Sequence, residues 1–292
     1  MYQRSITHNN RALFIFAIDC STSMREMTRL NTIILSKAKA AALICNYFID
    51  ELLERARRNG VIRNYYDIAV IGYSGDDSFS MLTCADSELV SIERLAGHCP
   101  PLNTIHLEQQ LPTGHTTSVP FMLHEWITPM HENSTPMYAA MTHIYDLVKQ
   151  WCKEPDNRES FPPIVINISD GDCSDSEDSF LLDITDKIKA TATEDGNTLI
   201  INIHLASVRS NTPSIVFPGE KSFKSNDHNC MLLYEMSSTI PQELETTIAA
   251  LFNKNEKGPY RGVAYNSIAC DILSIMNIGT RSINQTSRYN SI

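Results

Sequence analysis

The chain has 292 residues, of which 42% are apolar and 20% are charged. This composition supplies enough apolar side chains for one large core or two small ones, and it excludes a disordered, collagen-like or coiled-coil protein. Acidic residues outnumber basic ones by 34 to 24, which gives a formal net charge of -10. Because that charge opposes non-specific attraction to polyanions, we expect neither nucleic acid nor a membrane surface as a partner.

The cysteines and the N-terminus indicate the compartment. Eight cysteines are scattered without a Cys-x-x-Cys pair, and several lie in apolar runs, so we expect them to be reduced and structural. The opening MYQRSITHNN has no apolar segment of the kind found in secretory leaders. The apolar run from Ala12 to Ile18 is far shorter than the ~20 residues that span a bilayer. We therefore expect a cytoplasmic protein.

The first half of the chain predicts strands and one long helix. Ala12–Ile18 (ALFIFAI) is continuously apolar, which is typical of a strand covered on both faces in a parallel sheet. Apolar residues recur at steps of three or four from Leu30 to Leu52, which predicts an amphipathic helix that ends near Asn59-Gly60. Further strands are expected at Tyr66–Tyr73 and at Phe121–Thr128.

The second half continues the alternation of strands and helices. Pro136 opens a predicted helix that runs to about Lys153, and IVINIS at Ile164–Ser169 is a buried strand. A helix at Phe180–Glu194 and a strand at Leu199–Leu205 follow. This alternation predicts an α/β fold with a Rossmann-like, doubly wound, mostly parallel sheet flanked by helices.

The C-terminal part is less regular. Ser207–Asn229 is rich in Ser, Asn, Pro and Lys and is expected to be a long surface excursion. An edge strand is expected at Cys230–Tyr234, with helices at Pro241–Phe252 and Ser267–Ile278. We interpret the chain as a single domain at 1–279, with a motif-bearing core at about 11–206, an extension at 207–279 and a polar, mobile tail at 280–292.

Oxygen-bearing side chains follow the predicted strands. In an open parallel sheet ligands bind beyond the carboxyl ends of the strands. Asp19, Ser21 and Ser23 follow the first strand in a D-x-S-x-S pattern, and Asp170 follows the strand at 164–169. Thr135 precedes a predicted helix. All five are therefore expected at one end of the sheet.

These donors predict a site for a hard cation. The D-x-S-x-S spacing directs alternate side chains to one side of a turn, so that one carboxylate and two hydroxyls converge. Oxygen ligands select hard cations, and Mg²⁺ prefers few protein ligands with retained waters; Mn²⁺ and Ca²⁺ are the alternatives. With hydroxyls on the metal and carboxylates held through water, the ion would keep much of its charge and accept a carboxylate from another molecule.

The segments DCSTSM, STPMYAAM and ISDGD resemble the von Willebrand factor type A domain with its metal-ion-dependent adhesion site. Asp19, Ser21, Ser23, Thr135 and Asp170 occur in the order of that family's motif. The resemblance implies a Rossmann-like sheet with the metal at its top, direct contact from the two serines and sometimes the threonine, and aspartates that act largely through water. It also implies a protein partner that donates an acidic side chain to the metal.

The resemblance covers roughly residues 11 to 206, with one departure: Ser134 precedes the threonine where the family usually has glycine. The stretches SSTIP at 237–241 and AYNSIACDILSIMNIGT at 264–280 resemble the soluble bacterial branch associated with tellurium-resistance and stress operons. That likeness implies a signalling or stress-response complex, with a phosphatase or kinase of the same operon as partner.

Two other functions remain open. Ser21 and Ser23 also suit a helix start as N-caps, and Thr135 before Pro136 has the pattern of an N-cap followed by proline, which would give a metal-free scaffold. Asp170-Gly171-Asp172 resembles the paired aspartates of Toprim-type phosphoryl-transfer folds that hold Mg²⁺. That enzyme would need an early Glu, where this chain has hydroxyls, so we expect a binding module without catalysis.

Two other patterns favour plain structural roles. The acidic loop at 172–178 (DCSDSED) is expected to be a solvated loop that supplies the first turn of the next helix. The histidines have no His-x-x-x-His spacing, so we do not expect a zinc site.

Overall fold

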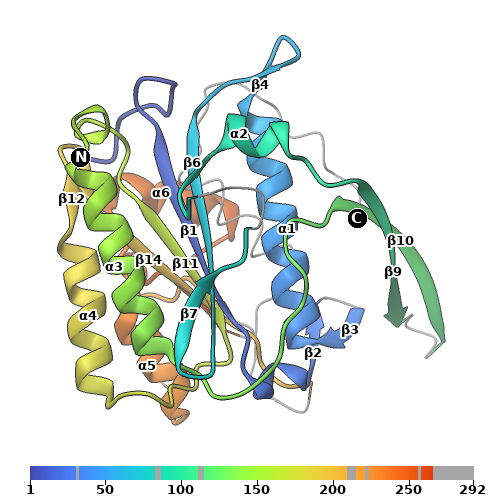
Figure 1. Ribbon diagram of the computed structural model, residues 1–292. Helices are drawn as coiled ribbons and strands as arrows, with labels where there is room; N and C mark the ends of the chain where they lie inside the picture. The colour runs from blue at the N-terminus through green and yellow to red at the C-terminus, as the bar shows by residue number, and fades with distance from the viewer. Residues whose placement is uncertain are drawn as a thin grey trace.

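The computed structural model describes residues 1–30, 33–82, 87–110, 115–208, 215–220, 223, 225–255 and 258–265. An eight-stranded sheet forms its central layer, and helices cover both faces of that sheet (Figure 1). The fold class is therefore α/β, as expected.

The elements have the following bounds. The strands of the main sheet are β1 (Ala12–Asp19), β6 (Tyr66–Ser74), β7 (Asp77–Ser80), β8 (Val90–Ser91), β11 (Ile164–Ser169), β14 (Leu199–His204), β15 (Ile215–Val216) and β16 (Val263–Tyr265). A second sheet contains β2 (Met27–Leu30), β3 (Ile33–Ser36), β9 (Leu102–Gln110) and β10 (Thr116–His124). Two small hairpins are β4 (Arg57–Arg58) with β5 (Val61–Ile62), and β12 (Ala192–Thr193) with β13 (Gly196–Asn197). The helices are α1 (Lys37–Ala56), α2 (Ile92–Gly97), α3 (Met137–Lys153), α4 (Asp178–Ala190), α5 (His228–Met236) and α6 (Gln242–Leu251), with short 3-10 helices η1 (Thr22–Arg25) and η2 (Pro155–Asn157).

The main sheet is parallel at its centre and antiparallel at its margins. Its strand order is β15-β16-β14-β11-β1-β6-β7, and β8 also pairs with β6. Strands β16, β14, β11, β1 and β6 run parallel, while β15, β7 and β8 are antiparallel to their neighbours. The expected mostly parallel, doubly wound sheet is confirmed.

The continuous apolar run of β1 reflects burial on both faces. Every residue of β1 is buried. Phe14 and Phe16 face the side covered by α1, α2 and α6, and the Phe16 ring centroid lies 5.5 Å from that of Phe48 in α1. Leu13 and Ile15 face the side covered by α3, α4 and α5. Helices on both faces leave no alternation of polar residues in the central strands.

The long helix begins later than the apolar spacing predicts. β2 (Met27–Leu30) pairs antiparallel with β3 (Ile33–Ser36), so Leu30 and Ile34 are strand residues. The helix begins at Lys37 because the Ser36 side chain caps it, accepting a hydrogen bond from the Lys39 N–H. At the other end, Asn59-Gly60 is the turn of the β4–β5 hairpin and not a helix terminus.

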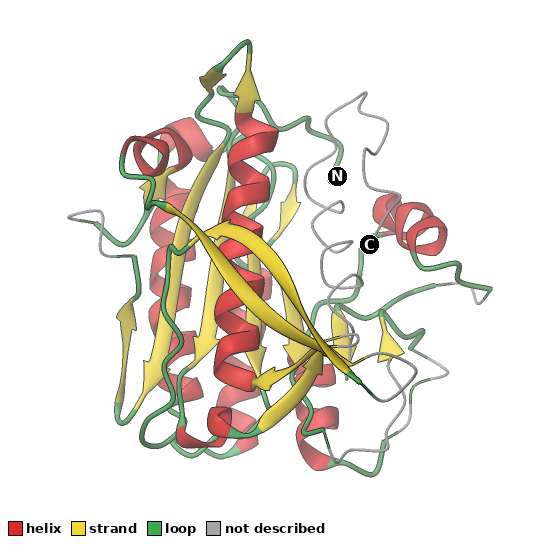
Figure 2. Cartoon of the chain, turned by 90° about the vertical axis from the view of Figure 1, so that its right-hand side faces the viewer, coloured by secondary structure: helices red, strands yellow, loops and turns green. Residues whose placement is uncertain are grey.

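The predicted third strand at 121–128 lies outside the main sheet. It overlaps β10, which pairs antiparallel with β9 along its whole length. Figure 2 shows this long hairpin crossing in front of α1. The expectation was wrong because the local pattern identifies a strand but not the sheet that it joins.

Two expectations for the C-terminal part change, and a third is not tested. The predicted edge strand at 230–234 is helix α5, because the Asp227 side chain caps it by accepting the Cys230 N–H at 3.1 Å. The expected surface excursion contributes β15 to the main sheet and buries Val216 and Phe217. The predicted helix at 267–278 and the tail at 280–292 lie outside the described residues.

In the described part of the chain, none of the helices combines the length and apolar character needed to span a bilayer.

Candidate metal site

The two predicted aspartates lie where the sheet reverses its order. The next strand of the central parallel set after β1 is β6, which lies on one side of β1. The later strands β11 and β14 lie on the other side of β1, with β11 next to β1 and β14 beyond it. Such a reversal opens a crevice at the carboxyl ends of the two central strands. Asp19 is the last residue of β1 and Asp170 directly follows β11. Both therefore lie at the carboxyl ends of two neighbouring strands, where this topology favours a ligand crevice.

Asp19 is a buried carboxylate with one oxygen unsatisfied. Its side chain is 0% exposed, and Oδ1 accepts the Ser21 N–H at 2.9 Å. Oδ2 is also buried and has no hydrogen-bond partner among the described residues. Burial, together with the nearby Asp170 charge, raises the pKa of Asp19 to about 7. Burial thus favours the neutral form of this carboxyl, and a nearby cation would favour its charged form.

The two serines face each other rather than capping a helix. Ser21 occupies the N-cap position of η1, yet its side chain makes no capping hydrogen bond. Its Oγ lies instead 3.0 Å from the Oγ of Ser23. The capping alternative therefore does not describe the Ser21 side chain.

Thr135 is buried, and it precedes the N-cap of α3 instead of occupying the N-cap position that its sequence pattern predicts. Pro136 itself holds the N-cap position, and α3 begins at Met137. The Thr135 N–H donates to Ser174 Oγ at 2.8 Å, and its carbonyl accepts the Ser174 N–H at 3.0 Å. These bonds attach Thr135 to the loop that carries Asp170.

Hydrogen bonds also join the loops that carry the serines and the threonine. The Thr22 N–H donates to the Asn133 carbonyl at 2.9 Å. Ser134 Oγ donates to the Gly75 carbonyl at 2.6 Å, and the Gly75 N–H donates back to the Ser134 carbonyl at 3.2 Å. Ser134, which replaces the glycine usual in the resembled family, therefore connects the threonine loop to the β6–β7 turn. Segments far apart in the sequence converge as expected.

Asp170 forms an ion pair with a lysine that was not predicted. Its Oδ2 lies 3.0 Å from Lys37 Nζ, which is also 2.8 Å from Glu26 Oε2. The Lys37 side chain is only 6% exposed. Burial alone would lower the pKa of Lys37, but the carboxylates of Glu26 and Asp170 outweigh burial and hold it above its usual value. Lys37 is therefore a charged ammonium at the edge of the crevice.

One sequence signal could have identified Lys37. Helix residues four apart share a face. Lys37 lies four residues before Ala41 and eight before Cys45, both of which are on the buried stripe of α1. A lysine on such a stripe must reach a partner, because an unpaired buried ammonium is costly.

A polar cleft of about 490 Å³ lies beside the crevice. Ser23, Lys37 and Asp170 line it together with His204 and Asp172, and Asp227 and Tyr265 complete its far side. The His204 ring stacks on Tyr265 at 4.3 Å, and its Nε2 lies 3.0 Å from the Asp170 carbonyl. Burial lowers the pKa of His204 to about 4, so the imidazole is neutral and the cleft has three carboxylates against one ammonium.

The residues at the crevice fit a hard divalent cation. Asp170 Oδ1, like Asp19 Oδ2, is buried without a hydrogen-bond partner in the described residues. The predicted residues Asp19, Ser21, Ser23, Thr135 and Asp170 offer only oxygen donors, and oxygen donors suit Mg²⁺, Mn²⁺ or Ca²⁺ and not a soft metal. Nowhere in the described ranges do three His, Cys, Asp or Glu side chains gather as metal ligands. The donor set thus depends on hydroxyls.

The acidic loop at 172–178 has a structural role that the sequence did not reveal. The Asp175 carboxylate accepts the N–H groups of Tyr138 and Ala139, at 3.0 and 2.9 Å. Asp175 thus caps α3, whereas the expected contribution to the first turn of α4 comes from Asp178. Asp172 is exposed at the rim of the cleft.

A hydrogen-bonded chain of Ser, His and Glu lies elsewhere on the molecule. Ser78 Oγ is 3.0 Å from His143 Nδ1, and His143 Nε2 is 2.9 Å from Glu88 Oε2. In a hydrolytic triad the serine bonds to Nε2, so the two nitrogens are exchanged here. None of the three residues lines the cleft described above or the cavity described next. We interpret these hydrogen bonds as a structural link between β7, α3 and the segment before β8.

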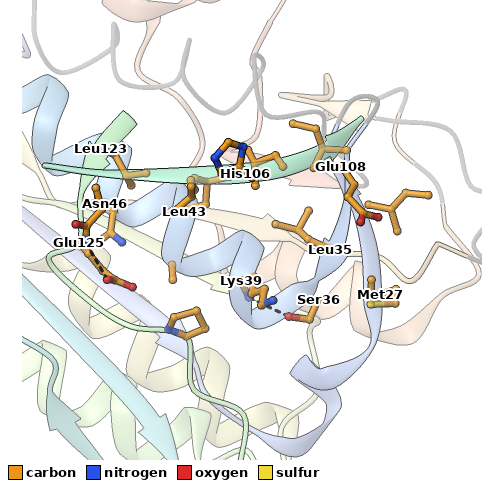
Figure 3. A pocket seen from close by; sticks show the side chains of 17 residues that line it. Met27, Leu35, Ser36, Lys39, Leu43, Asn46, His106, Glu108, Leu123 and Glu125 are labelled. Carbon is orange, nitrogen blue, oxygen red and sulfur yellow. Dashed lines mark hydrogen bonds between the residues drawn. The ribbon is translucent and has the colours of Figure 1, made fainter. Parts of the chain in front are cut away.

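A second cavity lies between α1 and the four-stranded sheet (Figure 3). Its volume is about 520 Å³, and it shares no lining residue with the polar cleft. Leu35, Leu43 and Leu123 give it apolar walls, while Lys39 and Glu125 lie at its margin. Its mixed charges favour no single class of ligand.

The described cysteines are unpaired. Cys20, Cys45 and Cys230 are buried, Cys152 and Cys173 are partly buried, and Cys99 is exposed. Burial of Cys20, Cys45 and Cys230 agrees with a structural role for these three thiols, whereas the exposed Cys99 does not fit that expectation.

Comparison with known protein families and with curated protein sequences finds no match. Among solved structures, a von Willebrand factor type A protein from Catenulispora acidiphila shares 9% identity, with a TM-score of 0.36 over 67% of this chain and 33% of that one. The chain thus spans about a third of that protein's length. An uncharacterized membrane spanning protein from Vibrio fischeri shares 12% identity, with a TM-score of 0.28 over 66% of this chain and 71% of that one. Similarity at this level assigns neither family nor function.

Proposed function

We propose that this chain is a protein-binding module that holds a Mg²⁺-type ion at a metal-ion-dependent adhesion site. The observation that carries the proposal is the pair of buried, unsatisfied oxygens of Asp19 and Asp170 at the reversal point of the sheet. Uncompensated buried carboxylate oxygens are costly, and a divalent cation satisfies both of them.

Each predicted residue has a distinct part in this proposal. Ser21, Ser23 and Thr135 would offer uncharged hydroxyl oxygens, while Asp19 and Asp170 would balance the charge largely through water. The ion would supply a positive charge that is only partly neutralised, and a carboxylate from a protein partner could therefore bind it. The surrounding loops would provide specificity, because a single charged contact gives little discrimination.

The charge of the neighbouring cleft supports a cation. Asp172 and Asp227 add two carboxylates to that of Asp170, against the single ammonium of Lys37. This excess would attract a divalent ion and would repel an acidic partner from the metal-free site. Partner capture is therefore expected to depend strictly on metal. The proposal includes no catalysis.

A cytoplasmic bacterial signalling or stress-response complex, with a phosphatase or kinase of the same operon as partner, is the biological setting that we propose. It rests on the sequence resemblance alone.

Calorimetric titration with Mg²⁺ and Mn²⁺ tests the metal site. We expect saturable binding to the wild type and none to Asp19→Asn, which keeps the shape of the side chain but removes its charge. Asp76→Asn is the matched control, because Asp76 is an exposed acid in the adjacent β6–β7 turn. Equal binding by wild type and Asp19→Asn would contradict the proposal.

A second experiment tests the partner. The double variant Ser21→Ala with Ser23→Ala should fold, since the two hydroxyls are each other's partners and Asp19 Oδ1 keeps the Ser21 backbone N–H. It should lose metal-dependent capture of partner protein, as should the wild type in the presence of a chelator. Undiminished capture by the double variant in chelator would place the interface elsewhere.

A further inference from the structure

Among the described residues that line the cleft, Lys37 is the one with a permanent positive charge. Its Nζ contacts Asp170 Oδ2 at 3.0 Å, and Asp170 is one of the two aspartates assigned to the metal. The ammonium and a divalent ion would therefore compete for the same carboxylate. They would also repel each other, because both would lie in a buried environment where charges are weakly screened.

Lys37 also has a second partner outside the crevice. Glu26 Oε2 lies 2.8 Å from Nζ, and the Glu26 side chain is 57% exposed. The same two residues are joined through the backbone, since the Lys37 N–H donates to the Glu26 carbonyl at 2.8 Å. The ammonium can thus release Asp170 and still keep a carboxylate partner at the surface.

We propose that Lys37 is a tethered cation that neutralises Asp170 in the metal-free protein and lowers the affinity of the site for a divalent ion. This inference rests on the proposed function, because it concerns the same site. Glu26 has the opposite effect in this scheme, since it draws the ammonium outward. The metal affinity of the site therefore depends on how often the Lys37 ammonium contacts Asp170 and how often it contacts Glu26 alone.

Calorimetric titration of Mn²⁺ into Lys37→Met tests the inference, since methionine keeps the unbranched apolar stem and removes the charge. We expect binding about tenfold to a hundredfold tighter than in the wild type, because a hydrogen bond to a charged group contributes on this scale. Lys39→Met is the matched control: Lys39 is exposed two residues further along α1, so affinity should change little.

Glu26→Gln should change the metal affinity in the direction opposite to Lys37→Met. Without the outer carboxylate, Lys37 is committed to Asp170, so metal binding should weaken. In the Lys37→Met background the same change should have a smaller effect, because the lysine through which Glu26 acts is gone. An equal loss in both backgrounds would mean that Glu26 acts by its own charge, which would overturn its assigned role.

The outcomes separate this inference from the proposed function. Equal affinity of wild type and Lys37→Met overturns the tethered cation and leaves the metal site intact. Binding by Lys37→Met alone supports the tethered cation and overturns metal use by the wild type. Absence of binding in both proteins overturns both proposals.

A measurement on the wild type covers the case in which Lys37→Met does not fold. Amine acetylation followed by mass spectrometry should label Lys37 slowly without metal, since its side chain is 6% exposed. Saturating Mn²⁺ should raise the labelling of Lys37 severalfold while Lys39 stays constant. Unchanged labelling of Lys37 on metal binding would overturn the inference.

Discussion

Buried polar side chains in this sheet are arranged in a connected network. Tyr73 donates its hydroxyl to Asn167 Oδ1 at 2.9 Å, and Asn167 Nδ2 donates to Asn202 Oδ1 at 2.9 Å. Asn202 in turn donates to Ser237 Oγ at 2.9 Å, which continues to the Leu233 carbonyl. The network joins β6, β11, β14 and α5, so it fixes the position of β11, whose end carries Asp170.

Tyr73→Phe should therefore lower the free energy of unfolding by about 1–3 kcal/mol, because it leaves the buried Asn167 Oδ1 without its donor. Urea denaturation measures the loss, and Tyr145→Phe on the partly buried face of α3 serves as the control. In a double-mutant cycle with Asn167→Leu, the two losses should sum to more than the loss in the double variant. Additive losses would contradict a direct bond between them.

At the scale of elements, the start of α3 depends on a loop from another part of the chain. Pro136 at the N-cap has no side-chain capping bond. Asp175 supplies the missing acceptor, with 3.0 and 2.9 Å bonds to the Tyr138 and Ala139 N–H groups. The loop after β11 is thus held against α3, next to Thr135.

Asp175→Ala should cost about 1 kcal/mol of folding free energy, the usual effect of losing a helix cap. In the same variant the hydrogen-exchange rates of the Tyr138 and Ala139 amides should rise, because both amides lose their acceptor. Asp76→Ala removes an exposed acid from the neighbouring turn and should change neither quantity. If the two variants behaved alike, the cap would have no energetic role.

At the scale of the whole molecule, two acidic side chains lie close together at the carboxyl edge of the main sheet. Asp19 and Asp170 approach closely enough for the Asp170 charge to raise the pKa of Asp19, and the chain has an overall charge of -10. A ligand that binds only the folded state stabilises it in proportion to the logarithm of its concentration. The proposed ion should therefore stabilise the entire fold.

Mg²⁺ at about a hundred times its dissociation constant should contribute ~2.7 kcal/mol and raise the Tm by about 5 °C for a chain of this size. Thermal unfolding followed by circular dichroism measures the shift. Sodium chloride at equal ionic strength controls for general screening. Asp19→Asn should show no shift beyond that control; a shift as large as in the wild type would indicate non-specific ion binding.

The sequence by itself determined the central strands, and it predicted the residues of the candidate site. β1, β6, β11 and β14 were predicted nearly to the residue, because strands buried on both faces are predominantly apolar. Oxygen-bearing residues at the strand ends could also be predicted, since parallel strands bring their carboxyl ends to one edge.

Only the tertiary structure decided which elements join and how the charges are partnered. The β2–β3 hairpin has apolar residues whose spacing mimics the start of α1, and β10 has a strand pattern that does not specify its sheet. Lys37 reaches Asp170 across 133 positions of sequence. Local patterns report burial and periodicity, whereas an ion pair between distant residues depends on how the chain folds back.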